Sequence, residues 1–154
     1  MIRVSLVDDH NVVRSGLKNI LTDETDITIT GESSNSEDII RKLSANDSDI
    51  DIIILDFALP GMNGLETLER IMEIRSNQKV LMLSMYDDKE FVIRALNAGA
   101  AGYLSKDCAS QELAAAIRKI DGGDIYLGKT LKLRFRIRKD AWSNKFTDFD
   151  QNVK

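Results

Sequence analysis

Short apolar runs alternate with helical stripes of apolar residues along most of this chain. The apolar runs predict five strands, at residues 2–7, 27–29 (32 at most), 52–55, 80–84 and 103–105. Between them apolar residues recur at intervals of three and four, which predicts helices at about 11–21, 34–43, 64–75, 87–96 and 110–121. Five alternations of strand and helix predict an α/β domain whose parallel sheet is doubly wound, with helices on both faces.

Most of the predicted helices begin at a short polar residue that can cap them. The expected caps are Ser34, Asn63, Asp87 and Ser110. Glu37 and Glu66 follow the first two caps by three residues, which is the spacing of a capping box. The fifth helix is expected to stop at the pair Gly122-Gly123.

The third strand is the most apolar segment, and it ends in a single acid. Residues 52–55 form a continuous aliphatic run, as expected of a strand that is covered on both faces of a parallel sheet. Asp56 follows directly, and the proline- and glycine-containing segment 57–64 cannot continue a central strand. A carboxylate in this position lies where open parallel sheets place their ligands. The simpler alternative is a strand-ending aspartate that caps a turn.

Three further strands also end in polar side chains. Asp8 and Asp9 follow the first strand, Ser84 ends the fourth, and Lys106 follows the fifth. Because the carboxyl ends of parallel strands meet at one edge of a sheet, we expect these side chains to lie beside Asp56. Three carboxylates at one point repel one another, and a hard divalent cation with oxygen ligands, such as Mg²⁺, relieves that repulsion. Agreement among four strand ends favours a site over an acidic pair that only stabilises a helix N-terminus.

Over about residues 1–122 the chain resembles the receiver domain of two-component response regulators. The resemblance rests on Asp8-Asp9, on Asp56 with Pro60-Gly61 behind it, on Ser84, and on Lys106 with Tyr103 three residues earlier. The patterns Asp-Asp-His-x-x-Val-Arg-x-Gly-Leu at 8–17 and Gly-Ala-x-Gly-Tyr-Leu-x-Lys at 99–106 resemble the NarL/FixJ branch. That branch usually attaches a C-terminal helix-turn-helix of LuxR type. The resemblance implies a flavodoxin-like (βα)5 fold with strand order 2-1-3-4-5.

The resemblance also implies what the acidic residues do. Asp56 would be the nucleophile that accepts a phosphoryl group from a sensor histidine kinase, forming an acyl phosphate. Asp9 and Asp56 would bind Mg²⁺ directly, and Asp8 would act mostly through water. The backbone carbonyl of Ala58 would complete the protein ligands of the metal.

Three other residues would complete the switch that the resemblance implies. Lys106 would pair with the phosphoryl oxygens, Ser84 would donate a hydrogen bond to them, and Tyr103 would rotate inward. Two positions depart from the family pattern. Asp107 follows the lysine where receivers often have a proline with a cis bond, so we expect a trans bond here. Ser84 replaces threonine and lacks the methyl group that stiffens χ1, so we expect a looser switch.

Aromatic and imidazole side chains near the site have lesser expected roles. His10, the only histidine of the chain, is expected to support the acidic pair or to pack beside it, rather than to act as a base or metal ligand. Phe57 and Tyr86 flank the site. We hypothesise that Tyr86 shields the acyl phosphate from water and makes the phosphorylated form long-lived.

Composition narrows the class of protein. The chain has 154 residues, of which 43% are apolar and 30% charged, as in a soluble globular domain with a tail. Its net charge of −4 gives no overall basic signature for nucleic acid. The single cysteine, Cys108, fits a reducing compartment, and we expect a cytoplasmic protein. No apolar run approaches the ~20 residues of a membrane span, so no membrane partner is expected.

Residues 123–154 are predicted as a tail or linker. Residues 131–138 alternate apolar and basic side chains, which predicts a basic β-strand. Six Lys or Arg between residues 129 and 139 would also suit an arm that contacts phosphates, and the strand is the favoured interpretation. Residues 140–154 are too few and too polar for a helix-turn-helix. DNA would therefore be bound only through an output domain that is absent from this chain.

Three functions are compared. The first is a phosphoacceptor that is part of a longer regulator and controls an output, expected to be transcription. The alternative form of this function is a stand-alone receiver that acts by protein–protein interaction. This receiver would form an isologous homodimer and would not be an enzyme beyond slow self-dephosphorylation. The second is a Mg²⁺-dependent phosphatase, but Ala58 stands where such enzymes usually carry a second acid. The third is an interaction module that works without phosphorylation and would tolerate a degraded site.

Overall fold

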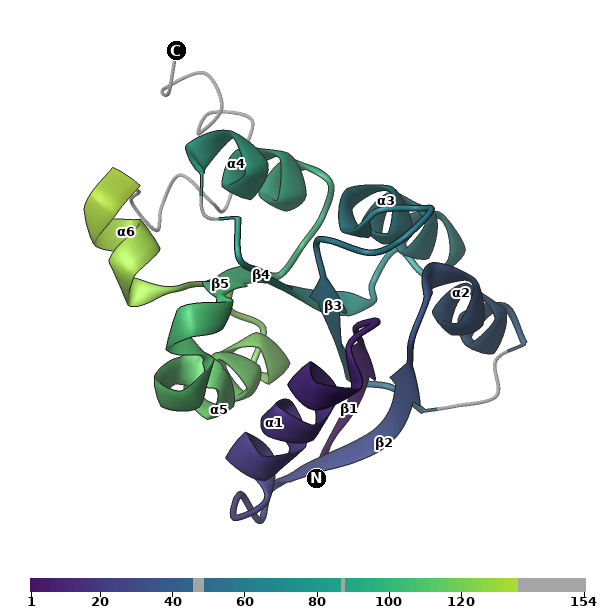
Figure 1. Cartoon of the computed structure of the whole chain (residues 1–154), viewed down its shortest axis with the longest axis horizontal. Helices are drawn as coiled ribbons and strands as arrows, with labels where there is room; N and C mark the ends of the chain where they lie inside the picture. The colour runs from purple at the N-terminus through teal and green to yellow at the C-terminus, as the bar shows by residue number, and fades with distance from the viewer. Residues whose placement is uncertain (46–48, 87, 136–154) are drawn as a thin grey trace.

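One parallel sheet organises the protein. The computed structural model describes residues 1–45, 49–86 and 88–135, and side chains as far as residue 132. The strands follow the order β2-β1-β3-β4-β5-β6, and the run from β2 to β5 can be followed in Figure 1. They are β1 (Ile2–Val7), β2 (Ile27–Ser33), β3 (Ile52–Asp56), β4 (Lys79–Ser84), β5 (Gly102–Ser105) and β6 (Tyr126–Leu127). The predicted doubly wound parallel sheet is confirmed, and its five strands are corrected to six, because β6 pairs with β5 at the edge.

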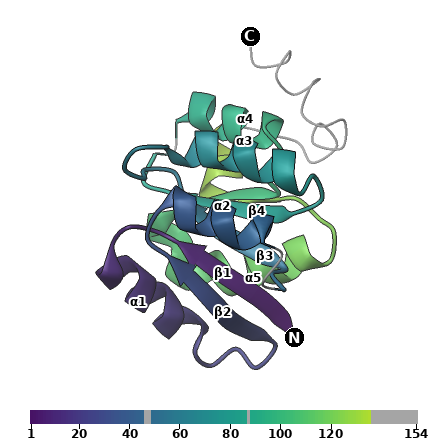
Figure 2. The ribbon, with the colours of Figure 1, turned by 90° about the vertical axis from the view of Figure 1, so that its right-hand side faces the viewer.

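The helices lie in two layers on either side of this sheet. They are α1 (Asn11–Leu21), α2 (Ser36–Ser44), α3 (Gly64–Ile74), α4 (Lys89–Asn97), α5 (Ala109–Asp121) and α6 (Lys129–Phe135), and the 3₁₀ turn η1 (Lys106–Cys108) precedes α5. Helices α1 and α5 cover one face, and α2, α3 and α4 cover the other (Figures 1 and 2).

The core follows the alternation of side chains along the central strands. Leu6, Ile52 and Ile54 point toward α1 and α5, where they meet buried leucines and isoleucines of those helices. Their neighbours Ile53 and Leu55 point toward α2, α3 and α4. All five residues of β3 are buried. The strand that ends in Asp56 is therefore enclosed along its whole length.

The helix starts partly differ from prediction. The capping box of α3 is confirmed, since Asn63 Oδ1 accepts the N–H of Glu66 at 2.9 Å and Glu66 Oε1 accepts the N–H of Asn63 at 3.4 Å. For α2 the predicted Ser34 cap is wrong. The cap is the next residue, Asn35, whose side chain accepts the N–H of Asp38 at 2.9 Å. Asparagine is at least as good a cap as serine, so a one-residue shift costs nothing.

Two further cap predictions can be compared with the structure. Helix α5 starts at Ala109, directly after η1, so the predicted cap Ser110 lies inside the helix and is wrong. The 3₁₀ turn already orders the preceding backbone, which allows the helix to begin without a side-chain cap. Helix α4 starts at Lys89, after Asp88. The predicted cap Asp87 lies outside the described residues.

The predicted strand at 131–138 is also wrong in the part that the structure describes, because residues 129–135 form α6. The burial of Leu131 and the hydrogen bonds of Glu112 explain the helix. Leu131 is buried in the apolar cluster on the α4 side of the sheet. The carboxylate of Glu112 on α5 accepts the N–H of Lys129 at 3.0 Å and the hydroxyl of Tyr126 at 2.6 Å. These contacts outweigh a local alternation of apolar and basic residues. Residues 136–138, like the rest of the tail, lie outside the described part.

Two smaller features complete the description of the fold. The described residues contain no cis peptide bond, so the bond between Lys106 and Asp107 is trans as expected. Across the same residues, none of the helices has both the length and the apolar character needed to span a bilayer.

Candidate functional site at the carboxyl edge of the sheet

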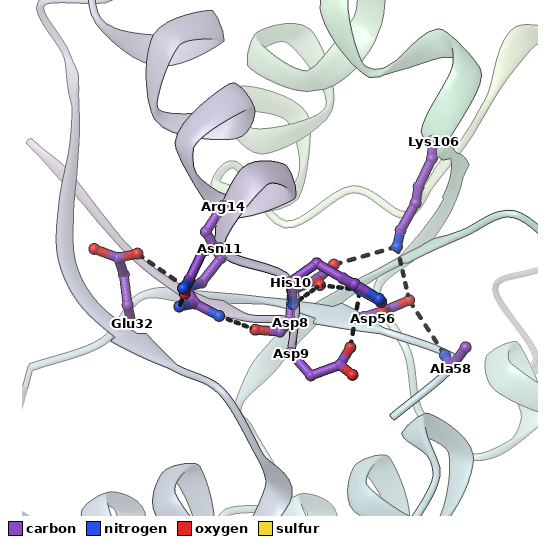
Figure 3. Close-up of polar contacts among 9 residues, drawn as sticks. All are labelled: Asp8, Asp9, His10, Asn11, Arg14, Glu32, Asp56, Ala58 and Lys106. Carbon is purple, nitrogen blue, oxygen red and sulfur yellow. Dashed lines mark hydrogen bonds and ion pairs between the residues drawn. The ribbon is translucent and has the colours of Figure 1, made fainter. Parts of the chain in front are cut away.

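Three strand ends bring their polar side chains together at one edge of the sheet. Asp56 is the last residue of β3, Asp8 and Asp9 follow β1, and Lys106 follows β5. Strands β1 and β3 pair in parallel, with Val7 opposite Leu55, so the residues after them are neighbours. Figure 3 shows the four side chains converging from the strand ends. The predicted convergence is confirmed for these residues, which are up to 98 positions apart in sequence.

The carboxylate of Asp56 is buried and only half satisfied. Its side chain is 3% exposed. Its Oδ1 lies 3.2 Å from Lys106 Nζ and accepts the N–H of Ala58 at 3.2 Å. Its Oδ2 is also buried and has no hydrogen-bond partner among the described residues. Burial and the nearby Asp8 carboxylate raise the pKa of Asp56, although Lys106 and the Ala58 N–H oppose that rise.

Asp8, in contrast, is fixed through its backbone and its side chain. Its N–H donates to the carbonyl of Ser33 at 3.1 Å, and its carbonyl accepts from the guanidinium of Arg14. Its Oδ1 accepts the N–H of His10 at 2.8 Å, and its Oδ2 accepts from Lys106 Nζ at 3.2 Å. Asp8 is therefore the oriented member of the acidic pair.

Lys106 bridges the two buried carboxylates. Its Nζ lies 3.2 Å from both Asp8 Oδ2 and Asp56 Oδ1, and its side chain is largely buried. Burial alone would lower the pKa of Lys106, but the carboxylates of Asp56 and Asp8 outweigh it and raise the pKa. The lysine therefore stays charged, and one cation is shared by two anions.

Asp9 and His10 lie on the outer side of this group. The buried Oδ1 of Asp9 accepts no hydrogen bond within the described part of the chain, yet His10 Nδ1 lies 3.0 Å from it. The same ring nitrogen lies 3.2 Å from Asp8 Oδ1. The imidazole is 62% exposed. The ring thus touches both acids, as expected of a supporting residue, but it is not packed in the core.

The donor set at this edge fits a divalent cation. Asp8, Asp9, His10 and Asp56 each offer a ligand atom, and these atoms all lie within 4.8 Å of one another. Two buried carboxylate oxygens, on Asp9 and Asp56, lack hydrogen bonds from the described residues. A buried anionic oxygen without a partner is costly, and a cation satisfies it. The structure places Ala58 in the site through its N–H, and the ligand role of its carbonyl stays a prediction.

Ser84 lies on β4 and Tyr103 on β5, and both side chains form hydrogen bonds with the backbone of Tyr86. Both side chains are fully buried. Ser84 Oγ accepts the N–H of Tyr86 at 2.8 Å, and the hydroxyl of Tyr103 donates to the carbonyl of the same residue. Tyr103 therefore occupies an inward position. The Tyr86 ring contacts Phe57 and Phe91, with ring centroids 6.0 and 5.7 Å apart, and its shielding role stays a prediction.

Sequence reasoning missed an arginine that holds the acidic loop. Arg14 on α1 donates to the carbonyl of Asp8 and to the side chain of Asn11, and its Nε donates to Glu32 Oε1 at 3.1 Å (Figure 3). Lys18 Nζ binds the other oxygen of Glu32 at 2.8 Å. The spacing of Arg14 from the start of α1 places it near the acidic pair. Its partner on β2 was not predictable, because a register shift between β1 and β2 precedes Glu32.

Comparison with known proteins agrees with this geometry. Residues 4–118 match the family described as response regulator receiver domain. The response regulator domain of Thermotoga maritima CheB has a similar structure, with a TM-score of 0.71 and 26% identity, over 79% of this chain and 97% of that one.

Two curated relatives come from Escherichia coli K12. Response regulator UvrY is 37% identical over 131 residues, which are 85% of this chain and 59% of UvrY. The nitrate/nitrite response regulator protein NarL is 38% identical over 128 residues, or 83% of this chain and 58% of NarL. The chain thus spans somewhat more than half the length of these relatives. It belongs to the response regulator receiver domain family and, with UvrY and NarL among its relatives, to the NarL/FixJ branch of that family.

Proposed function

We propose that this chain is a phosphoacceptor that takes one phosphoryl group on the side chain of Asp56. The observation that carries the proposal is the asymmetry of this buried carboxylate. Its Oδ1 is held by Lys106 and by the N–H of Ala58, whereas its Oδ2 has no described hydrogen-bond partner. An oxygen that is held in place but not used in hydrogen bonding is suited to nucleophilic attack.

The proposed donor is a phosphohistidine on a sensor histidine kinase. A bond forms between Asp56 Oδ2 and phosphorus while the phosphorus–nitrogen bond breaks. The electron pair stays on the imidazole nitrogen of the kinase, which takes up a proton, and the product on this chain is an acyl phosphate. Lys106 remains beside Asp56 Oδ1 and offsets the negative charge that the phosphoryl oxygens bring.

Mg²⁺ is the cation that we assign to the acidic cluster. Asp9 and Asp56 are the proposed direct ligands, Asp8 acts mostly through water, and the carbonyl of Ala58 is the last protein ligand. These donors are all oxygens, which suit a hard cation that keeps several waters. When bound, the cation offsets negative charge on the transferring group. The orientation of Asp8 by its own backbone contacts keeps the acidic loop ready for it.

Ser84 and Tyr103 are the proposed switch. Ser84 Oγ uses an acceptor position for the Tyr86 N–H, so its own hydroxyl proton remains available to a phosphoryl oxygen on Asp56. Movement of Ser84 toward that oxygen carries Tyr86 with it, and the Tyr86 carbonyl accepts from Tyr103. Phosphorylation therefore changes the population of two arrangements of the β4 and β5 ends.

We further propose that the output is transcription, through a DNA-binding domain of LuxR type outside this sequence. The chain covers 59% of UvrY and 58% of NarL, which leaves room in the relatives for such a domain. The alternative is a stand-alone receiver that acts through protein contacts, and a homodimer is a proposed partner in either case. In either case the chain turns over no substrate beyond slow loss of its own phosphoryl group. Ala58 supplies no second acid for multiple turnovers.

The test is incubation with acetyl phosphate and Mg²⁺, followed by intact mass. The expected result is a stoichiometric gain of ~80 Da, the mass of one phosphoryl group. Asp56→Asn abolishes the gain, and the matched control Asp121→Asn, at the exposed end of α5, keeps it. Continuous release of phosphate over many turnovers would instead make the chain an enzyme. An unchanged mass with folded wild-type protein would remove the phosphoacceptor role.

A further inference from the structure

Of the four described residues whose ligand atoms cluster at this edge, His10 is the one that the proposed function does not use. It occupies the N-cap position of α1, but its side chain makes no capping hydrogen bond among the described residues. Its ring instead turns toward the acidic pair, as Figure 3 shows, and remains mostly open to solvent. A nitrogen ligand is not needed by Mg²⁺, which prefers oxygen. The position of this ring therefore calls for another explanation.

The contact between His10 and Asp9 is the informative one. His10 Nδ1 lies 3.0 Å from Asp9 Oδ1, yet the two atoms form no hydrogen bond and the oxygen is buried. The same nitrogen lies within hydrogen-bond distance of Asp8 Oδ1, at 3.2 Å. When two ligand atoms each lie about 2.1 Å from one metal ion and the ligand–metal–ligand angle is a right angle, the two atoms are about 3.0 Å apart. The separation of His10 Nδ1 from Asp9 Oδ1 thus matches that of neighbouring ligands around one cation, and its separation from Asp8 Oδ1 is close to it.

Asp56 completes the same group from β3. Lys106 holds Asp56 Oδ1 and Asp8 Oδ2, which leaves the buried Asp56 Oδ2 without a hydrogen-bond partner in the described chain. Its side chain is 3% exposed, and it belongs to the set of ligand atoms that lie within 4.8 Å of one another. The cluster therefore offers carboxylate oxygens and one imidazole nitrogen to a common point.

We propose that Asp8, Asp9, His10 and Asp56 also form a site for a transition-metal dication, with His10 Nδ1 as a nitrogen ligand. Imidazole suits Zn²⁺, Ni²⁺ and Cu²⁺ and is not used by Mg²⁺, so His10 adds affinity for the first group only. Such a cation competes with Mg²⁺ for the same carboxylates. The inference concerns metal binding alone and holds whether or not Asp56 is ever phosphorylated.

The test uses isothermal titration calorimetry with Ni²⁺ and, separately, with Mg²⁺, on the full chain without an affinity tag at one fixed, near-neutral pH. Ni²⁺ binds most carboxylate sites more tightly than Mg²⁺, so tight Ni²⁺ binding alone does not test the proposal. The decisive quantity is the change in Ni²⁺ affinity when His10 is replaced. His10→Asn is the variant of choice. Asparagine is a good N-cap for α1 and keeps a hydrogen-bond donor near Asp8, but it lacks the imidazole lone pair.

We expect His10→Asn to weaken Ni²⁺ binding by about tenfold or more, since even the outer partners of metal ligands cost about 10- to 100-fold when removed. Binding of Mg²⁺ should stay within about twofold of wild type, because oxygen ligands alone hold it. Cys108→Ser, which removes the only thiol, should change neither affinity. In NMR spectra the single histidine ring of the wild type should broaden at stoichiometric Ni²⁺.

Three results would overturn the proposal. Equal Ni²⁺ affinity in wild type and His10→Asn would remove His10 from the ligand set. An equal loss for Ni²⁺ and Mg²⁺ would make His10 a residue that only orients the acids. Loss of Ni²⁺ binding in Cys108→Ser would move the nickel site to the thiol. None of these results depends on acetyl phosphate, so the phosphoacceptor proposal would stand or fall separately.

Discussion

The two edges of the sheet both carry acids and cations, and they combine them in opposite ways. At the amino edge Asp51 accepts from Nε and an Nη of Arg3, both at 3.1 Å. There too, Arg118 on α5 reaches both oxygens of Asp26, at 2.8 and 2.9 Å. Each of these acids faces an arginine in forked geometry. At the carboxyl edge Lys106 is shared between two buried carboxylates, those of Asp8 and Asp56.

The acids respond to these surroundings in opposite directions. The hydrogen bonds from Arg3 lower the pKa of Asp51, and those from Arg118 lower the pKa of Asp26. Burial and the Asp8 carboxylate raise the pKa of Asp56. Acids that are fully matched by cations hold elements together, whereas a surplus of buried negative charge is a cost that a bound cation, a proton or a chemical step relieves. The comparison thus separates structural ion pairs from a functional site.

The largest effect is expected from removing the shared cation. Lys106→Met leaves Asp8 and Asp56 buried side by side, so we expect the free energy of unfolding at neutral pH to fall by about 3 kcal/mol. Urea denaturation in the presence of a chelator measures it. Saturating Mg²⁺ should recover part of the loss, because the cation binds only the folded protein.

The matched change at the other edge is Arg118→Met. Its ion pairs are solvent-exposed, so we expect a much smaller loss of stability and no response to Mg²⁺. Similar losses in the two variants, or a similar Mg²⁺ response, would remove the distinction between the edges.

The next effect is on metal binding rather than on stability. Arg14→Ala releases the carbonyl of Asp8, so we expect Mg²⁺ affinity, measured by calorimetry, to fall by about tenfold. Lys18→Ala is the control, because Lys18 binds the same Glu32 without touching Asp8, and its Mg²⁺ affinity should not change. If both variants lose affinity equally, Glu32 rather than the Asp8 carbonyl carries the effect.

The smallest expected effect concerns how the stability of the fold depends on pH, which should differ between an acid at one edge and an acid at the other. Because the pKa of Asp56 is raised in the folded state, its charge destabilises the fold above the ordinary aspartate range. We expect Asp56→Asn, without metal, to melt higher than wild type near neutral pH. That advantage should shrink as pH falls through the raised pKa.

Asp51→Asn should show the opposite trend. The lowered pKa of Asp51 means that its stabilising contribution is present above the ordinary aspartate pKa and is lost as pH falls through the lower folded value. Asp51→Asn should therefore melt lower than wild type near neutral pH, and the deficit should close in acid. Melting temperatures from pH ~3 to ~7 cover both transitions. Parallel curves for the two variants would contradict the assigned pKa directions.

The convergence of Asp8, Asp9, Asp56 and Lys106 was predictable because topology fixes it. The carboxyl ends of parallel strands lie at one edge of the sheet, so polar residues that directly follow the strands converge there regardless of the loop conformations. The contact of His10 with Asp9 is a matter of one rotamer, and the sequence carries no signal for it. The pairing of Arg14 with Glu32 depends on the register between β1 and β2, which shifts within the pair.

The C-terminal elements were predicted poorly for a different reason. Strand β6 has two residues, too few to show any periodicity. Helix α6 has the alternation of a strand, but Leu131 is drawn into the core and Glu112 meets the backbone of Lys129. Those contacts are formed with residues distant in sequence, and a local pattern cannot express them. The same applies, on a smaller scale, to the choice of Asn35 over Ser34 as the cap of α2.

Glu112 links the last described strand to the last described helix through one carboxylate oxygen. Its Oε1 receives both the Tyr126 hydroxyl and the Lys129 amide, one on each side of Gly128. A rotation of α5 by a few degrees would therefore be passed on to the direction in which the polypeptide departs from the receiver.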